Sequence, residues 1–243
     1  MLENYLILSY FCVIIIFQSI IGVGVLVLGT PLLLILKYNI IEIFFILLPI
    51  SIITSLINLL IINFSNKHLD KSTYDEFKKF FIICIPSIFI GLIVLKLFKD
   101  VLNFKIIVSI VIFFSIALVS LKDKIKLKIN FFRKSILSIV GIIHGLTNSG
   151  GTLMSLALSV NNEKSYARLN TSFFYLILAT FQYILTIILF FDYFIYPNNI
   201  KVLVVLAIGI ILGNLINNYL EYKTYKMMIN FLAVISALIL LSI

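Results

Sequence analysis

Residues 141–152 read GIIHGLTNSGGT and residues 22–31 read GVGVLVLGTP, and these two clusters of small residues decide the fold. Each cluster lies in a stretch without Asp, Glu, Lys or Arg, 33 residues long at 4–36 and 28 residues long at 135–162. Both stretches exceed the roughly 20 residues of one transmembrane helix. Glycine and proline weaken a helix, and Asn, Ser and Thr can satisfy the backbone groups that a break frees. We therefore expect the first and fifth segments to be broken or re-entrant.

The composition of the whole chain suits a lipid bilayer. The chain has 243 residues, of which 62% are hydrophobic and only 12% are charged, whereas a soluble domain carries about a quarter charged residues. Six further charge-free stretches are 43–66, 80–95, 106–121, 169–191, 202–220 and 227–243. The sequence therefore predicts an all-α integral membrane protein with about eight transmembrane helices, which we expect in the cell membrane as a multi-pass protein.

The order of the segments repeats along the chain. Each half opens with an overlong segment and closes with shorter ones, and Gly91 in the third segment is matched by Gly213 in the seventh. We expect two similar four-helix halves, with a first transmembrane repeat at 1–121, a basic loop at 122–134 and a second repeat at 135–243. Duplicated halves are common in transporters, where they meet near the middle of the bilayer.

The positive charges bear on the orientation in the membrane. The net charge of +9 is spread over loops, which the positive-inside rule explains without a nucleic-acid partner. If all eight segments cross once, one face carries 11 Lys and Arg residues and the other carries 8. This slight bias favours both termini in the cytoplasm, and a re-entrant hairpin in either overlong segment would change the count.

The two small-residue clusters are also the candidate binding site. A half-helix that starts after a break points unpaired amide groups and the positive end of its dipole at the gap, which stabilises an anion. Corresponding interruptions in two halves of a membrane chain indicate a substrate site, although glycines also serve close helix packing. The expected substrate-binding residues are Gly22, Gly24, Pro31, His144, Asn148, Ser149, Gly150, Gly151, Thr152 and Asn170.

Two basic side chains leave alternatives open. His144 is the ionisable group within the fifth segment, and such groups mark proton paths; a neutral histidine that hydrogen-bonds across a helix contact is the plainer interpretation. Arg168 heads the sixth segment, where it offers positive charge at a pathway mouth or acts as an interfacial anchor. Gln18, Asn58 and Gln182 are expected to form hydrogen bonds between helices first and substrate contacts second.

Enzyme signatures are missing from the sequence. It contains no HExxH, GxSxG or Walker motif and no carboxylate pair within the segments, so we expect no enzyme and no catalytic residues. Cys12 and Cys84 have no spacing that would hold a metal, and we expect neither a metal site nor a cofactor.

Taken in order, the motifs resemble those of the sulfite exporter TauE/SafE family of membrane permeases. The similar parts are GVGVLVLGTPLLL and GIIHGLTNSGGTLMSLAL, together with IPSIFIGLIVLKLF and AIGIILGNLINNYL, which look like the helices that close each family repeat. The resemblance covers nearly the whole chain. It implies a secondary permease for sulfite, sulfonates or related small anions.

The leading hypothesis is thus a secondary transporter for a small anion, with the lipid bilayer as its surroundings and protons as a candidate coupling ion. The alternative is a non-transporting membrane scaffold or assembly partner in which the glycines only pack.

Overall fold

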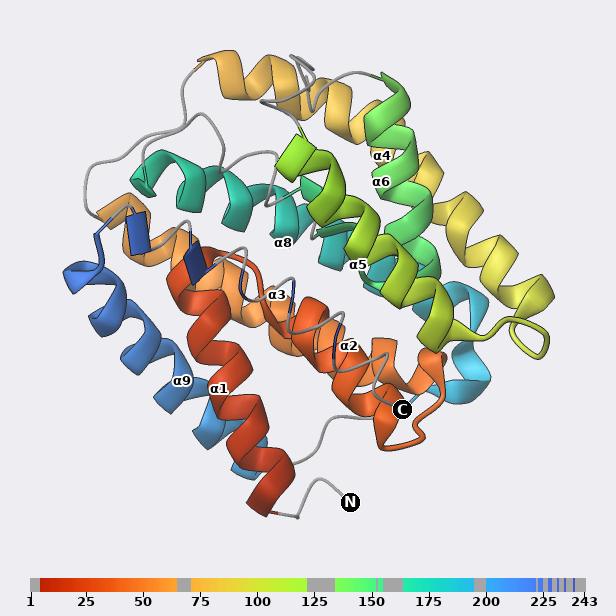
Figure 1. Cartoon of the computed structure of the whole chain (residues 1–243), viewed down its shortest axis with the longest axis horizontal. Coiled ribbons are helices and arrows are strands. Elements are labelled where there is room, and N and C mark those ends of the chain that lie inside the picture. Colours follow the sequence, from red (N-terminus) through yellow and green to blue (C-terminus); the bar gives the residue numbers. More distant parts are fainter. Residues whose placement is uncertain are drawn as a thin grey trace.

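The computed structural model describes residues 5–64, 71–121, 134–151, 153–154, 164–194 and 200–221, together with 223, 224, 227, 228, 231, 234 and 238. Every regular element in these residues is helical (Figure 1). The elements are α1 (Tyr5–Ile21), α2 (Val25–Ile35), α3 (Ile40–Phe64), α4 (Lys71–Phe98), α5 (Phe104–Leu121), α6 (Lys134–Thr147), α8 (Lys164–Leu189), the 3-10 turn η1 (Phe191–Tyr193) and α9 (Ile200–Tyr219). The fold is all-α, as predicted.

Four of these helices are long and apolar enough to cross a membrane. The candidate spans are Ile40–Ile62, Phe77–Phe98, Ser165–Leu189 and Ile200–Tyr219. The expected breaks also occur, because the first overlong segment is divided into α1 and α2 and the fifth ends its first helix at Thr147. Of the predicted basic loop, residues 122–133 lie outside the described residues and Lys134 begins α6.

Glycines set the closest helix contacts. A Cβ atom at Gly91 of α4 would run into the carbonyl oxygen of Ile142 in α6, and one at Gly213 of α9 would lie 2.7 Å from the carbonyl oxygen of Ile16 in α1. Close approach through small residues is how helices associate in lipid. The α4–α6 and α1–α9 pairs therefore flank a centre in which α3 packs on α8 (Figure 1).

Several helix ends gather at one face of the bundle. A groove of about 660 Å³ runs between the α2–α3 turn and the α4–α5 turn. Asn39 and Glu42 cap α3 there: Ile41 N–H donates to Asn39 Oδ1 at 3.0 Å and Asn39 N–H donates to Glu42 Oε2 at 3.1 Å, which is a capping box. Lys99 Nζ donates to the Tyr193 hydroxyl at 2.7 Å, and this hydrogen bond raises the pKa of Lys99 above its usual value. This face therefore brings together the α2–α3 turn, the α4–α5 turn and η1.

Candidate functional site

The first break follows α1. Helical conformation stops at Ile21 and resumes at Val25, and Gly22 between them has φ +93°, a left-handed conformation that glycine adopts without strain. The N–H of Gly22 donates to the carbonyl oxygen of Gln18 at 2.7 Å. A Cβ atom at Gly22 would lie 2.9 Å from Ser172 Oγ, so the first break lies directly against α8.

The second break repeats this backbone geometry. Helix α6 stops at Thr147 and helical conformation resumes at Gly150, while Asn148 between them has φ +62°. The N–H of Asn148 donates to the carbonyl oxygen of His144 at 2.8 Å. Asn is the residue after glycine that best tolerates this conformation. Gly22 and Asn148 thus play the same backbone role, each four residues after a buried polar side chain.

After each break the chain folds back along the helix that it has just left. A Cβ atom at Gly24 would lie 2.8 Å from the backbone nitrogen of Gln18 and 3.1 Å from the carbonyl oxygen of Ile14. A Cβ atom at Gly150 would lie 2.7 Å from His144 Cβ and would collide with the carbonyl oxygen of Val140. In both cases the glycine meets the residues six and ten positions earlier, so each break is the tip of a helical hairpin.

The side chain before the first break binds the new helix. Gln18 is fully buried, and its Oε1 accepts a hydrogen bond from the N–H of Val25, the first residue of α2, at 2.9 Å. Its Nε2 donates to the carbonyl oxygen of Ser51 at 2.9 Å and to Ser55 Oγ at 3.0 Å. Gln18 therefore caps α2 and fastens the first hairpin to α3.

The side chain before the second break, that of His144, neither caps a helix nor bonds to a neighbouring helix in the described residues. His144 is fully buried, and within the described part of the chain neither ring nitrogen has a hydrogen bond of normal geometry, although the ring lies near the backbone of Asn148. Its backbone still matches Gln18, because Gln182 Nε2 donates to the carbonyl oxygen of His144 at 3.1 Å and Asn58 Nδ2 donates to that of Gln18 at 3.2 Å. The second hairpin therefore holds a buried imidazole whose polar atoms are not satisfied by the described residues.

The two hairpins meet beside α8. The backbone N–H of Leu26, in the first turn of α2, points toward the hydroxyl of Tyr175, and among the described residues this hydroxyl has no hydrogen bond of normal geometry. The ring of Tyr175 lies 6.2 Å from that of His144, and a Cβ atom at Gly151 would collide with it. Tyr175 therefore touches the first turn of one hairpin and both sides of the other.

A direct contact also joins the hairpins. Asn148 Nδ2 donates to Thr30 Oγ1 of α2 at 3.4 Å. Pro31 follows Thr30 in the interior of α2, where it is buried and lies away from the break. Gly22, Gly24, Asn148, Gly150 and Gly151 thus lie at the two breaks, His144 lies one turn before the second break, and Pro31 lies inside α2.

The remaining predicted site residues are Ser149, Asn170 and Thr152. Ser149 bonds within its own turn, since its Oγ donates to the carbonyl oxygen of Thr147 at 3.2 Å. Asn170 is buried in α8 with no partner for Oδ1 among the residues that the structure describes. Thr152 lies outside the described residues.

Arg168 is buried rather than anchored at the interface. It is only 6% exposed, and its guanidinium donates to the carbonyl oxygen of Ser19 at 2.6 Å and to Asn214 Oδ1 at 2.5 Å. A longer bond of 3.4 Å reaches Asn217 Oδ1. These bonds tie α8 to α1 and α9, so a positive charge stands beside the first break inside the bundle.

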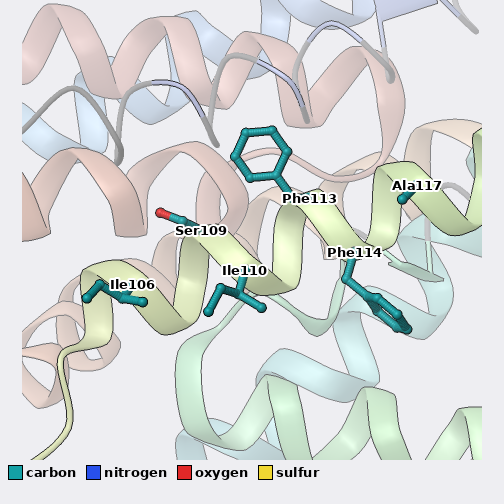
Figure 2. A pocket seen from close by; sticks show the side chains of 6 residues that line it. All are labelled: Ile106, Ser109, Ile110, Phe113, Phe114 and Ala117. Carbon is teal, nitrogen blue, oxygen red and sulfur yellow. The ribbon is translucent and has the colours of Figure 1, made fainter.

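The groove along α5 is a poor candidate for a polar ligand. It encloses about 390 Å³, and its lining residues are Ile106, Ser109, Ile110, Phe113, Phe114 and Ala117 (Figure 2). Its one hydroxyl, that of Ser109, already donates to the carbonyl oxygen of Lys105 at 2.7 Å. The groove therefore offers rings and aliphatic side chains but no free polar group.

The central site gathers hydrogen-bond donors and, in the described residues, no metal ligand set. The described residues contain no group of three His, Cys, Asp or Glu side chains that could hold a metal ion. The polar groups gathered there are the first-turn amides of α2, the phenol of Tyr175 and the imidazole of His144. Hydroxyl, imidazole and amide N–H groups donate hydrogen bonds, and the dipole of α2 adds positive potential.

Sequence reasoning missed two residues of this site as such. Gln18 was expected to bond between helices, and it does, but its role as the cap of α2 was not foreseen. Tyr175 was not singled out, because tyrosine in an apolar run reads as a packing residue. One sequence signal was present: Gln18 precedes Gly22 by the same four positions by which His144 precedes Asn148.

Comparison with models of protein families matches residues 6–240 to the family described as Sulfite exporter TauE/SafE. Neither a curated protein nor a solved structure matches the chain. The family match covers nearly the whole chain and confirms the resemblance inferred from the glycine-rich motifs.

Proposed function

The chain belongs to the sulfite exporter TauE/SafE family, and from this premise we propose that it is a secondary permease for a small sulfur-containing anion, bound between the two hairpins. At the coarser level it is a multi-pass membrane protein of a transporter family. Sulfite, a sulfonate or a related oxyanion is the substrate that the proposal names.

Tyr175 carries the proposal, because its hydroxyl faces the first turn of α2 and its ring lies 6.2 Å from that of His144. The N–H of Leu26 and the side chains of Tyr175 and His144 are buried together, and two of the three are polar groups without partners in the described chain. Each unsatisfied buried polar group costs about 1–3 kcal/mol, and an oxyanion would satisfy several at once. The site would bind an anion through neutral donors and a helix dipole, as helix N-termini do.

The matching geometry of the breaks supports a duplicated chain. The pairs Gln18 and His144, Gly22 and Asn148, and Gly24 and Gly150 have the same spacing and the same backbone contacts. We propose that residues 1–121 and 135–243 are structural repeats, each with a re-entrant hairpin. Rocking of such halves about a central site gives alternating access.

His144 is the proposed proton-coupling group of this site. It is ionisable, it touches Tyr175, and its ring has no hydrogen bond to another described residue. Protonation beside a bound anion would be favourable because the opposite charges attract in a medium of low dielectric constant. Symport of a proton with the anion is the expected result.

Flux into proteoliposomes tests the function directly. We expect saturable uptake of sulfite, thiosulfate or ethanesulfonate, no uptake of an acetate control, and stimulation by an imposed pH gradient. Gly150→Leu, which drives a side chain into Val140 and His144, should insert into the membrane and abolish flux. His144→Gln should remove the stimulation by the pH gradient.

Three outcomes would count against the proposal. Normal flux in Gly150→Leu would show that the substrate does not bind at the second break. Full pH dependence in His144→Gln would remove the proton role. Absence of both flux and binding for every anion, with only graded losses of stability on glycine substitution, would favour the scaffold alternative.

A further inference from the structure

One face of α8 carries a stripe of buried residues from end to end. Its members are Arg168, Ser172, Tyr175, Ala179, Gln182 and Thr186, and each of them is at most 6% exposed. Spacings of three and four place these residues on one side of a helix. They extend over 18 residues, or about 27 Å at 1.5 Å per residue, which approaches the roughly 30 Å thickness of the hydrocarbon core.

Two hydroxyl groups of this stripe differ from those of three residues in other helices. Thr54, Ser87 and Thr147 each donate to the carbonyl oxygen four residues earlier, at 2.7, 2.7 and 2.8 Å. Ser172 Oγ and Thr186 Oγ1 make no such bond and have no partner within the described ranges. Any serine or threonine in a helix can form this bond. Because Ser172 and Thr186 do not form it, their hydroxyl groups are available to another partner.

Two more oxygen atoms of the stripe also lack a hydrogen-bond partner among the described residues. The hydroxyl of Tyr175 and Oε1 of Gln182 have no partner in the part of the chain that the structure describes, although Nε2 of Gln182 is bonded. Polar atoms at membrane depth that are unsatisfied by protein normally face a watery cavity or a substrate. Four such atoms at successive levels of one helix face indicate a path rather than a point.

Resting on the proposed function, we propose that the substrate anion moves along this stripe of α8, and that the Tyr175 hydroxyl donates a hydrogen bond to it at the first turn of α2. Ser172 and Thr186 mark the two ends of the polar path, and Arg168 supplies positive charge beyond Ser172. At the centre, the Leu26 amide points toward the Tyr175 hydroxyl.

Cysteine labelling tests the path without relying on flux. Ser172→Cys and Thr186→Cys, made after Cys12→Ala and Cys84→Ala, are treated with a charged thiosulfonate that does not cross membranes. Both should be modified, because the stripe would be wet in the transport cycle. Ile188→Cys on the lipid side of the same helix, where Ile188 is 68% exposed, is the matched control and should resist the reagent. Equal resistance at all three positions would overturn the path.

Tyr175→Phe tests the hydrogen bond. The phenyl ring keeps the contacts with Gly151 and His144, so the fold is retained, and the KM for the transported anion should rise about 10-fold or more, the value of a lost bond to a charged group. Tyr183→Phe, a half-buried tyrosine of the same helix, should keep the original KM. An unchanged KM in Tyr175→Phe would overturn the assignment of the hydroxyl, whereas absence of flux in the unmodified protein, with the stripe still labelled, would count against the proposed substrates and leave the path standing.

Discussion

The two hairpins have the same backbone and different side chains at their tips. Gly22 and Asn148 turn the chain in the same way, and Gly24 and Gly150 pack on the residues six and ten positions earlier. The side chain of Gln18 then caps the first hairpin, whereas the ring nitrogens of His144 at the matching position have no hydrogen bond of normal geometry to a described residue. The comparison teaches that backbone and glycine hold the shape of both turns, while the hydrogen bonding of the side chain before the break differs between the two hairpins.

The largest expected effect comes from removing the shared feature. Gly24→Ala and Gly150→Ala both force a methyl group into backbone atoms, and such overpacking costs about 1–3 kcal/mol. We expect both variants to lose transport and to unfold earlier in detergent. Gly29→Ala is the control, since its methyl group would meet only the movable side chains of Leu47 and Ile14. If one of the two variants, Gly24→Ala or Gly150→Ala, had the same transport and stability as the control, the two hairpins would not be equivalent.

The second effect separates the hairpins. Gln18→Leu removes the cap of α2 and the bonds to Ser51 and Ser55, so the free energy of unfolding should fall by about 1–3 kcal/mol. His144→Leu removes an unsatisfied buried ring of similar size, so stability should hold or rise while anion affinity falls. Chemical unfolding and anion titration measure both. Equal losses of stability would show that His144 is as structural as Gln18.

The smallest effect concerns the residue that makes the turn. Asn148→Gly keeps the left-handed conformation and loses only the 3.4 Å bond to Thr30, a change below about 1 kcal/mol. Asn148→Ala should lower the free energy of unfolding further, because the left-handed conformation is about 1–2 kcal/mol less favourable for alanine. Melting temperatures of the two variants should therefore rank glycine above alanine. A lower melting temperature for Asn148→Gly than for Asn148→Ala would show that Asn148 does not have the backbone role of Gly22.

Much of the fold could be predicted from composition and from small residues. Charge-free stretches located the long spans, and glycine clusters located both breaks to within a few residues. The direction of the chain after a break could not be predicted, because it depends on which residues Gly24 and Gly29 pack against. Those residues are Gln18 and Ile14 of α1 and Leu47 of α3. Local patterns record where a helix fails and say little about what the next helix packs against.

The site was predicted in part for a similar reason. The glycines and His144 were named because their residue types are unusual in a membrane segment. Arg168 was open to interpretation as an anchor, since its acceptors Ser19, Asn214 and Asn217 come from helices at the two ends of the chain. Only the packed bundle brings these oxygens to one guanidinium.

The fold-back of α2 along α1 also alters which loops share a side of the membrane. Lys201 lies 5.8 Å over the ring of Tyr5, Lys99 meets Tyr193, and the α2–α3 turn lines one groove with the α4–α5 turn, so these ends lie together (Figure 1). Five of the 19 Lys and Arg residues lie in or next to these helix ends, namely Lys37, Lys96, Lys99, Lys105 and Lys201. With the hairpins counted, the positive-inside rule now favours an outward-facing start of α1, and protease access to a tag placed before Tyr5 in intact cells would reveal that orientation.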